Sequence, residues 1–214
     1  MPQFKKILLL VLMGSALTAC QQTVNKAVVV EYPSGATQIS SDFRSLQGIR
    51  GGIRRGGRHQ GIDIEGPVGA PVIAAADGVV LEVVTERCWG PTVVVDHGND
   101  LSQKPLIGVY GHVGDMLVSE GDSVDRGQII ARLGDNADKY DCISGVRHLH
   151  FQLGRQYRNK AEKADYWGYS YFLRDGDRGV NPHLLWSDGP YRVTCYAEGS
   201  EYPEGSLTYP VSCE

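Results

Sequence analysis

The chain has 214 residues, of which 42% are hydrophobic and 21% are charged. This length and composition are typical of one globular domain, with or without an extension. The formal net charge of −4 argues against a nucleic-acid partner, because such proteins present an excess of basic side chains. The 27 glycines favour turns and short strands over long helices.

The first segment, residues 1–19, has the pattern of an export signal. Lys5 and Lys6 precede the apolar run ILLLVLM, and small residues follow up to Cys20. The end of the segment, LTAC, resembles a bacterial lipoprotein signal, which implies that Cys20 is lipidated and anchors the exported chain to a membrane. Gln21, which is not an aspartate, implies the outer membrane of a Gram-negative bacterium, facing the periplasm. The alternative is an ordinary secretory signal with an incidental cysteine.

The rest of the chain divides by its pattern of strand and turn residues. Residues 20–38 are polar apart from one apolar patch and are predicted to form a tether. From residue 39 to 155, short strand signals alternate with breaks rich in Gly, Asp, Asn or Pro, which predicts an antiparallel all-β domain. The predicted strands contain GIDI, PVIAAA, VVLEVV, TVVVDHG, LIGVYGHV, MLVSEGDSV, GQIIARLG and RHLHFQL. Residues 156–214 are predicted to form a loop-rich C-terminal extension packed on this domain, with one short helix within 159–173.

Four cysteines follow the predicted signal: Cys88, Cys142, Cys195 and Cys213. An even number of cysteines in an oxidising compartment favours disulfides, and four cysteines allow three pairings. We favour Cys195–Cys213, which closes a local loop in the tail, together with Cys88–Cys142. The alternative is that some of them stay reduced and buried.

The segment RHLHFQL contains two histidines that are two residues apart. At the period of a strand, His148, His150 and Gln152 share one face, and Leu149, Phe151 and Leu153 share the other. A lone histidine on such a strand would need only a hydrogen-bond partner. Two on one face predict a site.

Other parts of the chain supply partners for this pair. His59 and Asp63 lie in GGRHQGIDIEG, where Asp63 is predicted to point away from the core, and His112 lies in VYGHV. Imidazole and carboxylate ligands suit Zn²⁺, and a catalytic zinc site takes three protein ligands and leaves a position for water. His59, Asp63 and one histidine of the pair would make such a set. The remaining histidines could then serve as general base and as stabiliser of developing charge.

These motifs together resemble the lysostaphin/LytM-type zinc metallopeptidases, which cut the peptide part of bacterial cell wall. The resemblance runs in the family's order through HQGIDI, GAPVIAAADGVV, VVVDHG, YGHV, GDSVDRGQII and HLHFQL, and VNP at 180–182 resembles the family's closing segment. It implies an antiparallel β-sandwich or barrel-sandwich core, one Zn²⁺ per chain and peptidoglycan cross-links as substrate. The bond that is cut stays open between a meso-diaminopimelate cross-link and a glycine bridge.

The resemblance also implies roles for individual residues. His59, Asp63 and His150 would be the zinc ligands. His148 would be the general base, and His112 would orient water and transition-state charge, although these two roles could be exchanged. Among the departures from the family, Gln152 stands where a glutamate is common, and FRSLQGIRGG lacks the usual glycine-then-arginine pattern.

Two loops are expected to border the substrate groove, ERCWG and the apparent insertion DNADKYDCISG. A Cys88–Cys142 bridge would tie these two walls together, and we prefer that pairing for this reason.

Three other functions compete with a peptidase. An inactive relative that activates cell-wall amidases would be expected to lack some of the five site residues, and all are present. A biotinyl or lipoyl carrier would need a lysine at a hairpin tip, a context that neither Lys104 nor Lys139 has. The histidines could also be separate surface residues.

Several further residues receive structural interpretations. His97 is expected to be solvated or structural, and His183 to lie at the surface. Tyr110 could pack in the core or donate at the groove. The basic cluster of Arg54, Arg55 and Arg58 is expected to be solvated, with the binding of an acidic wall peptide as the alternative.

Overall fold

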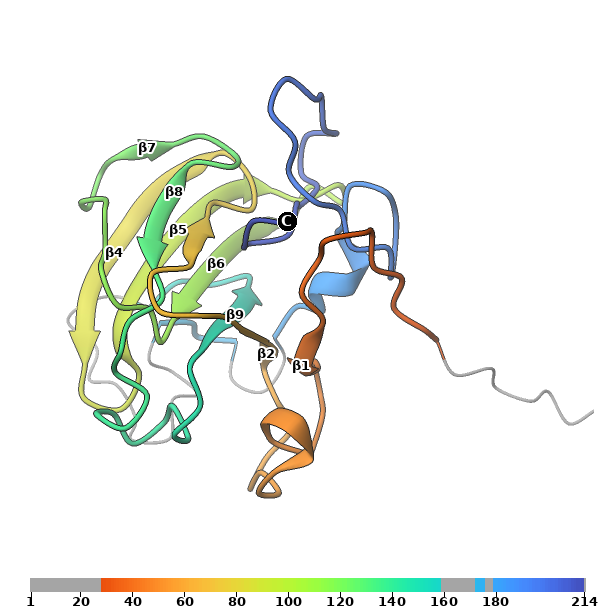
Figure 1. Ribbon diagram of the computed structural model, residues 1–214. Helices are drawn as coiled ribbons and strands as arrows, with labels where there is room; N and C mark the ends of the chain where they lie inside the picture. The colour runs from red at the N-terminus through yellow and green to blue at the C-terminus, as the bar shows by residue number, and fades with distance from the viewer. Residues whose placement is uncertain (1–27, 159–171, 176–178, 214) are drawn as a thin grey trace, which may run out of the picture.

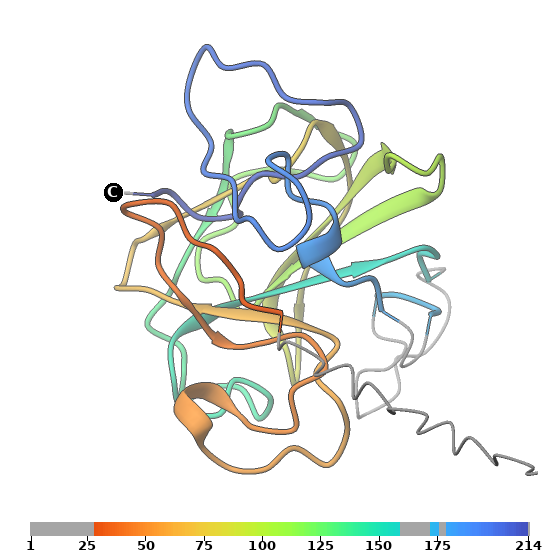
Figure 2. The same ribbon diagram turned by 90° about the vertical axis from the view of Figure 1, so that its right-hand side faces the viewer.

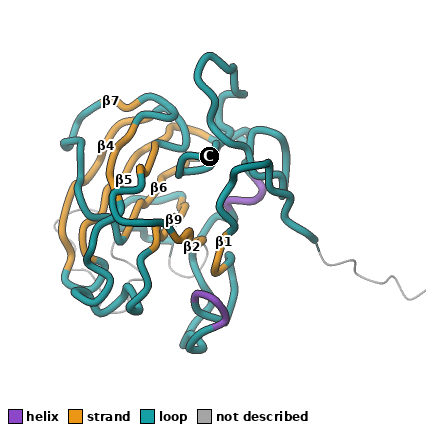
Figure 3. The backbone as a smooth tube through the Cα atoms, in the orientation of Figure 1, coloured by secondary structure: helices purple, strands orange, loops and turns teal. Residues whose placement is uncertain are grey.

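A computed structural model describes residues 28–158, 172–175 and 179–213. Most of this part of the chain is strand or loop, and its only helical segments are two short 3₁₀ turns, η1 (Ile49–Gly51) and η2 (Pro182–Leu184) (Figure 3). The predicted signal over 1–19, Cys20 and nearly all of the helix predicted within 159–173 lie outside the described residues. Among the described residues, no helix has the length and apolar character needed to cross a membrane.

Seven strands form the main sheet, in the order β1-β2-β9-β6-β5-β4-β7, and all neighbours are antiparallel (Figure 1). Their bounds are β1 Ile39–Ser41, β2 Gly61–Glu65, β4 Gly78–Glu86, β5 Gly90–Asn99, β6 Pro105–Gly111, β7 Ser123–Val124 and β9 His148–Gly154. A second antiparallel pair joins β3 (Pro71–Ile73) to β8 (Ile129–Arg132). The prediction of an antiparallel all-β fold is confirmed.

The main core lies between the curved sheet and the β3–β8 pair. Apolar side chains from both contribute to one cluster, among them Ile62, Val72, Val95, Ile130 and Phe151. A smaller cluster, which includes Trp89, Val94 and Val109, lies on the opposite face of the main sheet. The main sheet therefore packs on the β3–β8 pair through one face, as in a β-sandwich, and carries a smaller apolar cluster on the other face.

Apolar and polar residues alternate along β2 and β9, so that each strand has one core face and one polar face, as predicted. Ile62 and Ile64 join the main core from β2, and Leu149, Phe151 and Leu153 join it from β9. The pairing requires a glycine at position 61, because a Cβ there would lie 2.3 Å from the Phe151 carbonyl oxygen. With that close approach, Asp63 lies directly opposite His150 on the other face.

The C-terminal extension lies beside the N-terminal segment, as the blue and red-to-orange parts of Figure 2 show. The amide of Glu31 donates to the Tyr191 carbonyl (2.8 Å), and the amide of Val193 donates to the Glu31 carbonyl (2.9 Å). Part of the segment predicted as a tether is thus paired with the extension. The extension also places Trp186, Leu207 and Tyr209 in the main core.

Candidate metal centre

Three potential ligand atoms converge on the face of the sheet away from the main core. Asp63 Oδ1 lies 2.9 Å from His150 Nδ1 and 3.1 Å from His59 Nε2, and the two ring nitrogens are 3.1 Å apart. All three residues are buried. Strand pairing fixes Asp63 and His150 opposite each other, and His59 enters from the segment that precedes β2.

The second ring nitrogen of each imidazole has its own acceptor. His59 Nδ1 lies 3.0 Å from the Asp42 carbonyl oxygen, and His150 Nε2 lies 3.1 Å from Gln152 Oε1. Each of these nitrogens therefore carries the proton and donates, and the lone pairs of His59 Nε2 and His150 Nδ1 face Asp63. Gln152, noted in the sequence as a departure from the family, still accepts this bond through its amide oxygen.

Burial and neighbouring groups shift the ionisation of these residues. Burial lowers the pKa of His150, which favours the neutral imidazole that binds metal. Burial alone would raise the pKa of the Asp63 carboxyl, but its electrostatic contacts with the imidazoles of His59 and His150 outweigh this effect and hold that pKa well below its ordinary value. An ionised carboxylate that faces two imidazole lone pairs offers three electron-pair donors to a metal ion, with no proton between them.

This donor set fits a zinc ion. Tetrahedral ligands about 2.0–2.1 Å from zinc lie roughly 3.3 Å from one another, close to the separations of 2.9–3.1 Å found among the three atoms. Two nitrogens and one oxygen are also ligand types that zinc accepts.

Two more histidines stand beside this set. His148 Nδ1 donates to the Val146 carbonyl (2.6 Å), and His112 Nδ1 donates to the Trp89 carbonyl (2.7 Å). Both rings therefore keep an unprotonated Nε2, and that of His148 lies 3.6 Å from Asp63 Oδ1. The centroids of the two rings are 4.9 Å apart. Burial lowers the pKa of both imidazoles, so each is a neutral group that can accept a proton.

His112 has a backbone φ of 66°, in the left-handed region that side chains other than glycine seldom occupy. Such strain is found at functional sites. Here it accompanies the turn that follows β6 and brings the ring toward His148.

Arg55 makes a contact that the sequence did not reveal. Its Nη2 lies 2.5 Å from Asp63 Oδ2, the carboxylate oxygen that faces away from the histidines, and 3.2 Å from Ser41 Oγ. The expectation that this arginine is solvated is wrong for Arg55, whereas Arg54 and Arg58 are exposed. No sequence pattern predicts this contact, because Arg55 reaches Asp63 from a hairpin that folds back between Arg44 and His59.

A cleft of about 300 Å³ opens onto the candidate centre. Its walls come from the segment before β2, from Trp89, and from the loop that contains Asp141, Cys142 and Ser144. A Cys88–Cys142 disulfide joins two of these walls, with Cα atoms 5.0 Å apart, and a second disulfide joins Cys195 to Cys213. Both predicted pairings are confirmed.

The remaining predicted residues lie elsewhere. Tyr110 is fully buried in the main core, where its hydroxyl accepts from the Ala75 amide (2.9 Å), so it does not line the groove. His97 is buried and bonds to that same hydroxyl at 3.0 Å, a structural role. The expectation that His183 lies at the surface is wrong: it is 2% exposed, bonds to Asp42 Oδ1 at 2.7 Å and stacks on Tyr191.

The part of the chain that carries these residues is similar in sequence to known proteins. The model of the family described as Peptidase family M23 matches residues 57–163, half of the chain. The chain is 34% identical to the peptidoglycan DD-endopeptidase ShyA of Vibrio cholerae, over 54% of this chain and 24% of that protein. It is 35% identical to the murein hydrolase activator NlpD of Escherichia coli, over 49% of this chain and 24% of that protein. The chain thus spans about a quarter of the length of these relatives.

Among solved structures, a zinc-containing peptidase from Vibrio cholerae is similar over 72% of this chain and 39% of that one, with 26% identity and a TM-score of 0.46.

Proposed function

Because the chain belongs to peptidase family M23, we propose that it is a zinc-dependent endopeptidase that hydrolyses peptide cross-links of bacterial peptidoglycan. The observation that carries the proposal is the convergence of two imidazole lone pairs and one carboxylate oxygen within 2.9–3.1 Å, beside two further neutral histidines. The name of the relative ShyA, a peptidoglycan DD-endopeptidase, supports the substrate class.

His59, Asp63 and His150 would hold one Zn²⁺. When bound, the ion would act as a Lewis acid on the scissile carbonyl and make a water easier to deprotonate near neutral pH. His148 would accept the proton of the attacking water at Nε2 and pass it to the leaving amine, because its Nδ1 proton is held by the Val146 carbonyl. His112 would orient the attacking water by accepting a hydrogen bond from it at its unprotonated Nε2, and once protonated there it would stabilise developing negative charge.

The competing function is that of a catalytically inactive activator of cell-wall amidases, as the name of the relative NlpD suggests. The intact set of five residues favours the enzyme. Purified protein would be assayed for zinc content and for cleavage of isolated peptidoglycan. Bound zinc with cleavage supports the endopeptidase, and protein that neither binds zinc nor cleaves would favour the activator.

Substitution of two neighbouring histidines separates the ligand from the base. We expect His150→Ala to abolish zinc binding and activity together. We expect His148→Ala to keep zinc at one ion per chain and to lower kcat by about 10²–10⁴-fold, the usual contribution of a general base. Metal analysis and turnover on the same preparations check both. Turnover retained in His148→Ala would remove the role proposed for this residue.

We also propose that the chain is exported and lipidated at Cys20, and that it acts at the outer membrane facing the periplasm. Incorporation of labelled fatty acid into the protein, and its loss in Cys20→Ser, would test the anchor. Mass spectrometry of muropeptides before and after digestion would show which bond is cut; a meso-diaminopimelate cross-link is the expected one.

A further inference from the structure

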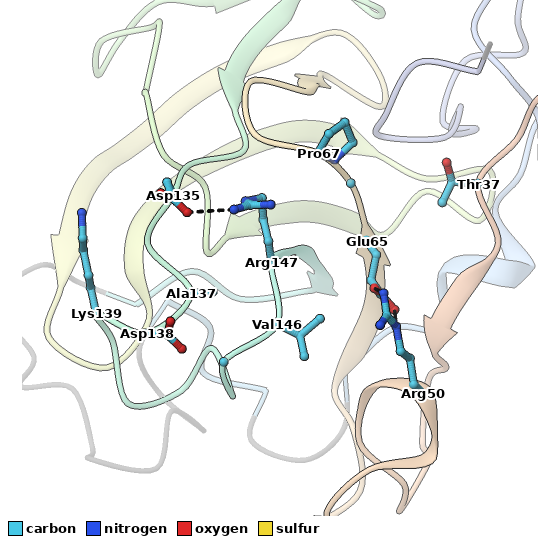
Figure 4. A pocket seen from close by; sticks show the side chains of 12 residues that line it. Thr37, Arg50, Glu65, Pro67, Asp135, Ala137, Asp138, Lys139, Val146 and Arg147 are labelled. Carbon is cyan, nitrogen blue, oxygen red and sulfur yellow. Dashed lines mark hydrogen bonds and ion pairs between the residues drawn. The ribbon is translucent and has the colours of Figure 1, made fainter.

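A second cavity, of about 880 Å³, lies next to the candidate metal centre and has no part in the chemistry described above. Figure 4 shows it between the end of β2 with the adjoining hairpin on one side and the loop of residues 135–147 on the other. Three cationic and three anionic side chains line it: Arg50, Lys139, Arg147, Glu65, Asp135 and Asp138.

The strand register places this cavity relative to the centre. Asp63 lies opposite His150, and the next pair on the same face of β2 and β9 is Glu65 opposite His148. Two residues along a strand correspond to about 6.6 Å. Glu65 lines the cavity, as does Val146, whose carbonyl holds the His148 ring. An extended peptide along this ladder would enter the cavity about two residues from the bond that is cut.

Two charges of opposite sign are held in fixed positions in the cavity. Arg147 donates from Nε to the Gly134 carbonyl and from Nη2 to Asp135 Oδ1, both at 2.8 Å. These bonds leave Nη1 of the guanidinium to donate to a ligand. On the other side, Arg50 binds both oxygens of Glu65, from Nε at 2.9 Å and from Nη2. Each carboxylate oxygen can accept a further bond.

We propose that this cavity binds a substrate residue that carries both a carboxylate and an ammonium group, as the side chain of meso-diaminopimelate does. The Arg147 guanidinium would bind the carboxylate, and the Glu65 carboxylate would accept from the ammonium. Charge-assisted bonds to groups that are already held in place are the strong ones, because little ordering remains to be done. The inference rests on the proposed function for its choice of a wall peptide as ligand.

Binding of soluble wall stem peptides tests this assignment, and an inactive protein would still yield a result. Two tetrapeptides serve as probes, one with meso-diaminopimelate and one with lysine at the same position, which keeps the ammonium but lacks the second carboxylate. We expect the full chain to bind the diaminopimelate peptide about tenfold more tightly, the usual effect of one charge-assisted bond. Equal affinity for the two peptides would overturn the assignment, and this comparison needs no variant.

Single substitutions then test which side chain binds which charged group of the peptide. We expect Arg147→Gln to weaken binding of the diaminopimelate peptide about tenfold and to leave the lysine peptide unchanged. Glu65→Gln should weaken both peptides alike. Arg192→Gln is the control, because this arginine also pairs with a glutamate, at 3.5 Å from Glu31, but does not line the cavity. An Arg147→Gln protein whose affinity falls equally for both peptides would contradict the proposal.

The proposed function can fail separately. If zinc-loaded protein shows the expected peptide preference but does not cleave cross-linked wall, the cavity assignment stands and the endopeptidase does not. If it cleaves wall but binds the two peptides equally, the endopeptidase stands and the cavity assignment does not.

Discussion

Each of the four histidines at the centre is fixed by an acceptor for one ring nitrogen, and that acceptor decides which atom faces the ligand. Backbone carbonyls of Asp42, Trp89 and Val146 hold three of the rings, and the Gln152 amide oxygen holds that of His150. Such outer partners set the tautomer and orientation of a metal ligand and are part of the site. The two imidazoles that contact Asp63 most closely are therefore oriented so that their lone pairs can coordinate a cation.

Arg55 is the outer partner of Asp63, and its removal should weaken metal binding. We expect Arg55→Gln to lower zinc affinity by about 10–100-fold, the usual cost of losing such a contact. The reason is that Asp63 Oδ2, now 2.5 Å from the guanidinium, would lose the charge that orients it. Competition with a chromogenic zinc chelator measures the affinity. Arg54→Gln is the matched control, because this neighbour is exposed, and an unchanged affinity in Arg55→Gln would refute the prediction.

The sequence was sufficient to predict the side chains that converge, but not the groups that hold them. His59, Asp63 and the pair of His148 and His150 stand out because of residue type and, on the strands, a period of two that places them on a face without core function. The choice of His150 within the pair followed from the family resemblance. Arg55 and the carbonyls of Asp42 and Trp89 carry no such signal, since any residue supplies a carbonyl and only the path of the loops decides where it points. His183 was misplaced for the same reason: Asp42, its partner, is 141 residues away.

At the scale of elements, three adjacent strands assemble most of the centre. Asp63 on β2 lies opposite His150 on β9, which in turn lies opposite Gly111 on β6, one residue before His112. The prediction of strands succeeded where apolar and polar residues alternate, as in β2 and β9. It failed over MLVSEGDSV, of which only Ser123–Val124 is strand, because three apolar residues in succession give no indication of a partner strand.

The Cys88–Cys142 bridge holds the loop that orients His112. The Trp89 carbonyl accepts from that ring at 2.7 Å, and the Trp89 indole meets the His150 ring edge-on at 4.8 Å between centroids. We expect the double variant Cys88→Ser, Cys142→Ser to keep zinc but to lose about tenfold in kcat, as for other outer contacts of a metal site. Turnover and zinc content are measured well below the unfolding temperature, since losing a disulfide also costs about 2–5 kcal/mol of stability.

The second disulfide is the matched control for this prediction. Cys195→Ser with Cys213→Ser removes a bridge of the C-terminal extension and should lower stability without changing kcat. Equal turnover in the two double variants would show that the Cys88–Cys142 bridge has no part in positioning His112.

For the whole molecule, buried histidines link stability to pH. His97 lies in the core, and burial lowers its pKa below the ordinary value of 6.5. The unfolded chain therefore binds more protons than the native protein at pH values between the two pKa values, so stability falls as the pH drops below about 6.5. We expect His97→Gln to reduce this slope, by at most about 1.4 kcal/mol per pH unit. Urea unfolding from pH 7.5 to 5 measures it, and parallel curves for the two proteins would contradict the expectation.

The C-terminal extension also belongs to the cooperative unit of the molecule. His183 bonds to Asp42 Oδ1 at 2.7 Å, and the Asp42 carbonyl holds the His59 ring, so a continuous path of contacts joins the extension to the centre. Trp186, which is 1% exposed, donates from its indole to His183 at 3.1 Å and packs in the main core. Unfolding of the extension would therefore open the core that supports β2.

Truncation of this indole should consequently destabilise the entire domain. We expect Trp186→Ala to cost about 3–5 kcal/mol, the usual penalty for emptying a large core position, and to lower the temperature of a single unfolding transition. Leu184→Ala is the matched control in the same short segment, because Leu184 is 49% exposed and should change stability by less than about 0.5 kcal/mol. Calorimetry with circular dichroism at two wavelengths checks both. Two separate transitions, with only the first displaced in Trp186→Ala, would show that the extension unfolds independently of the sheet that carries the metal ligands.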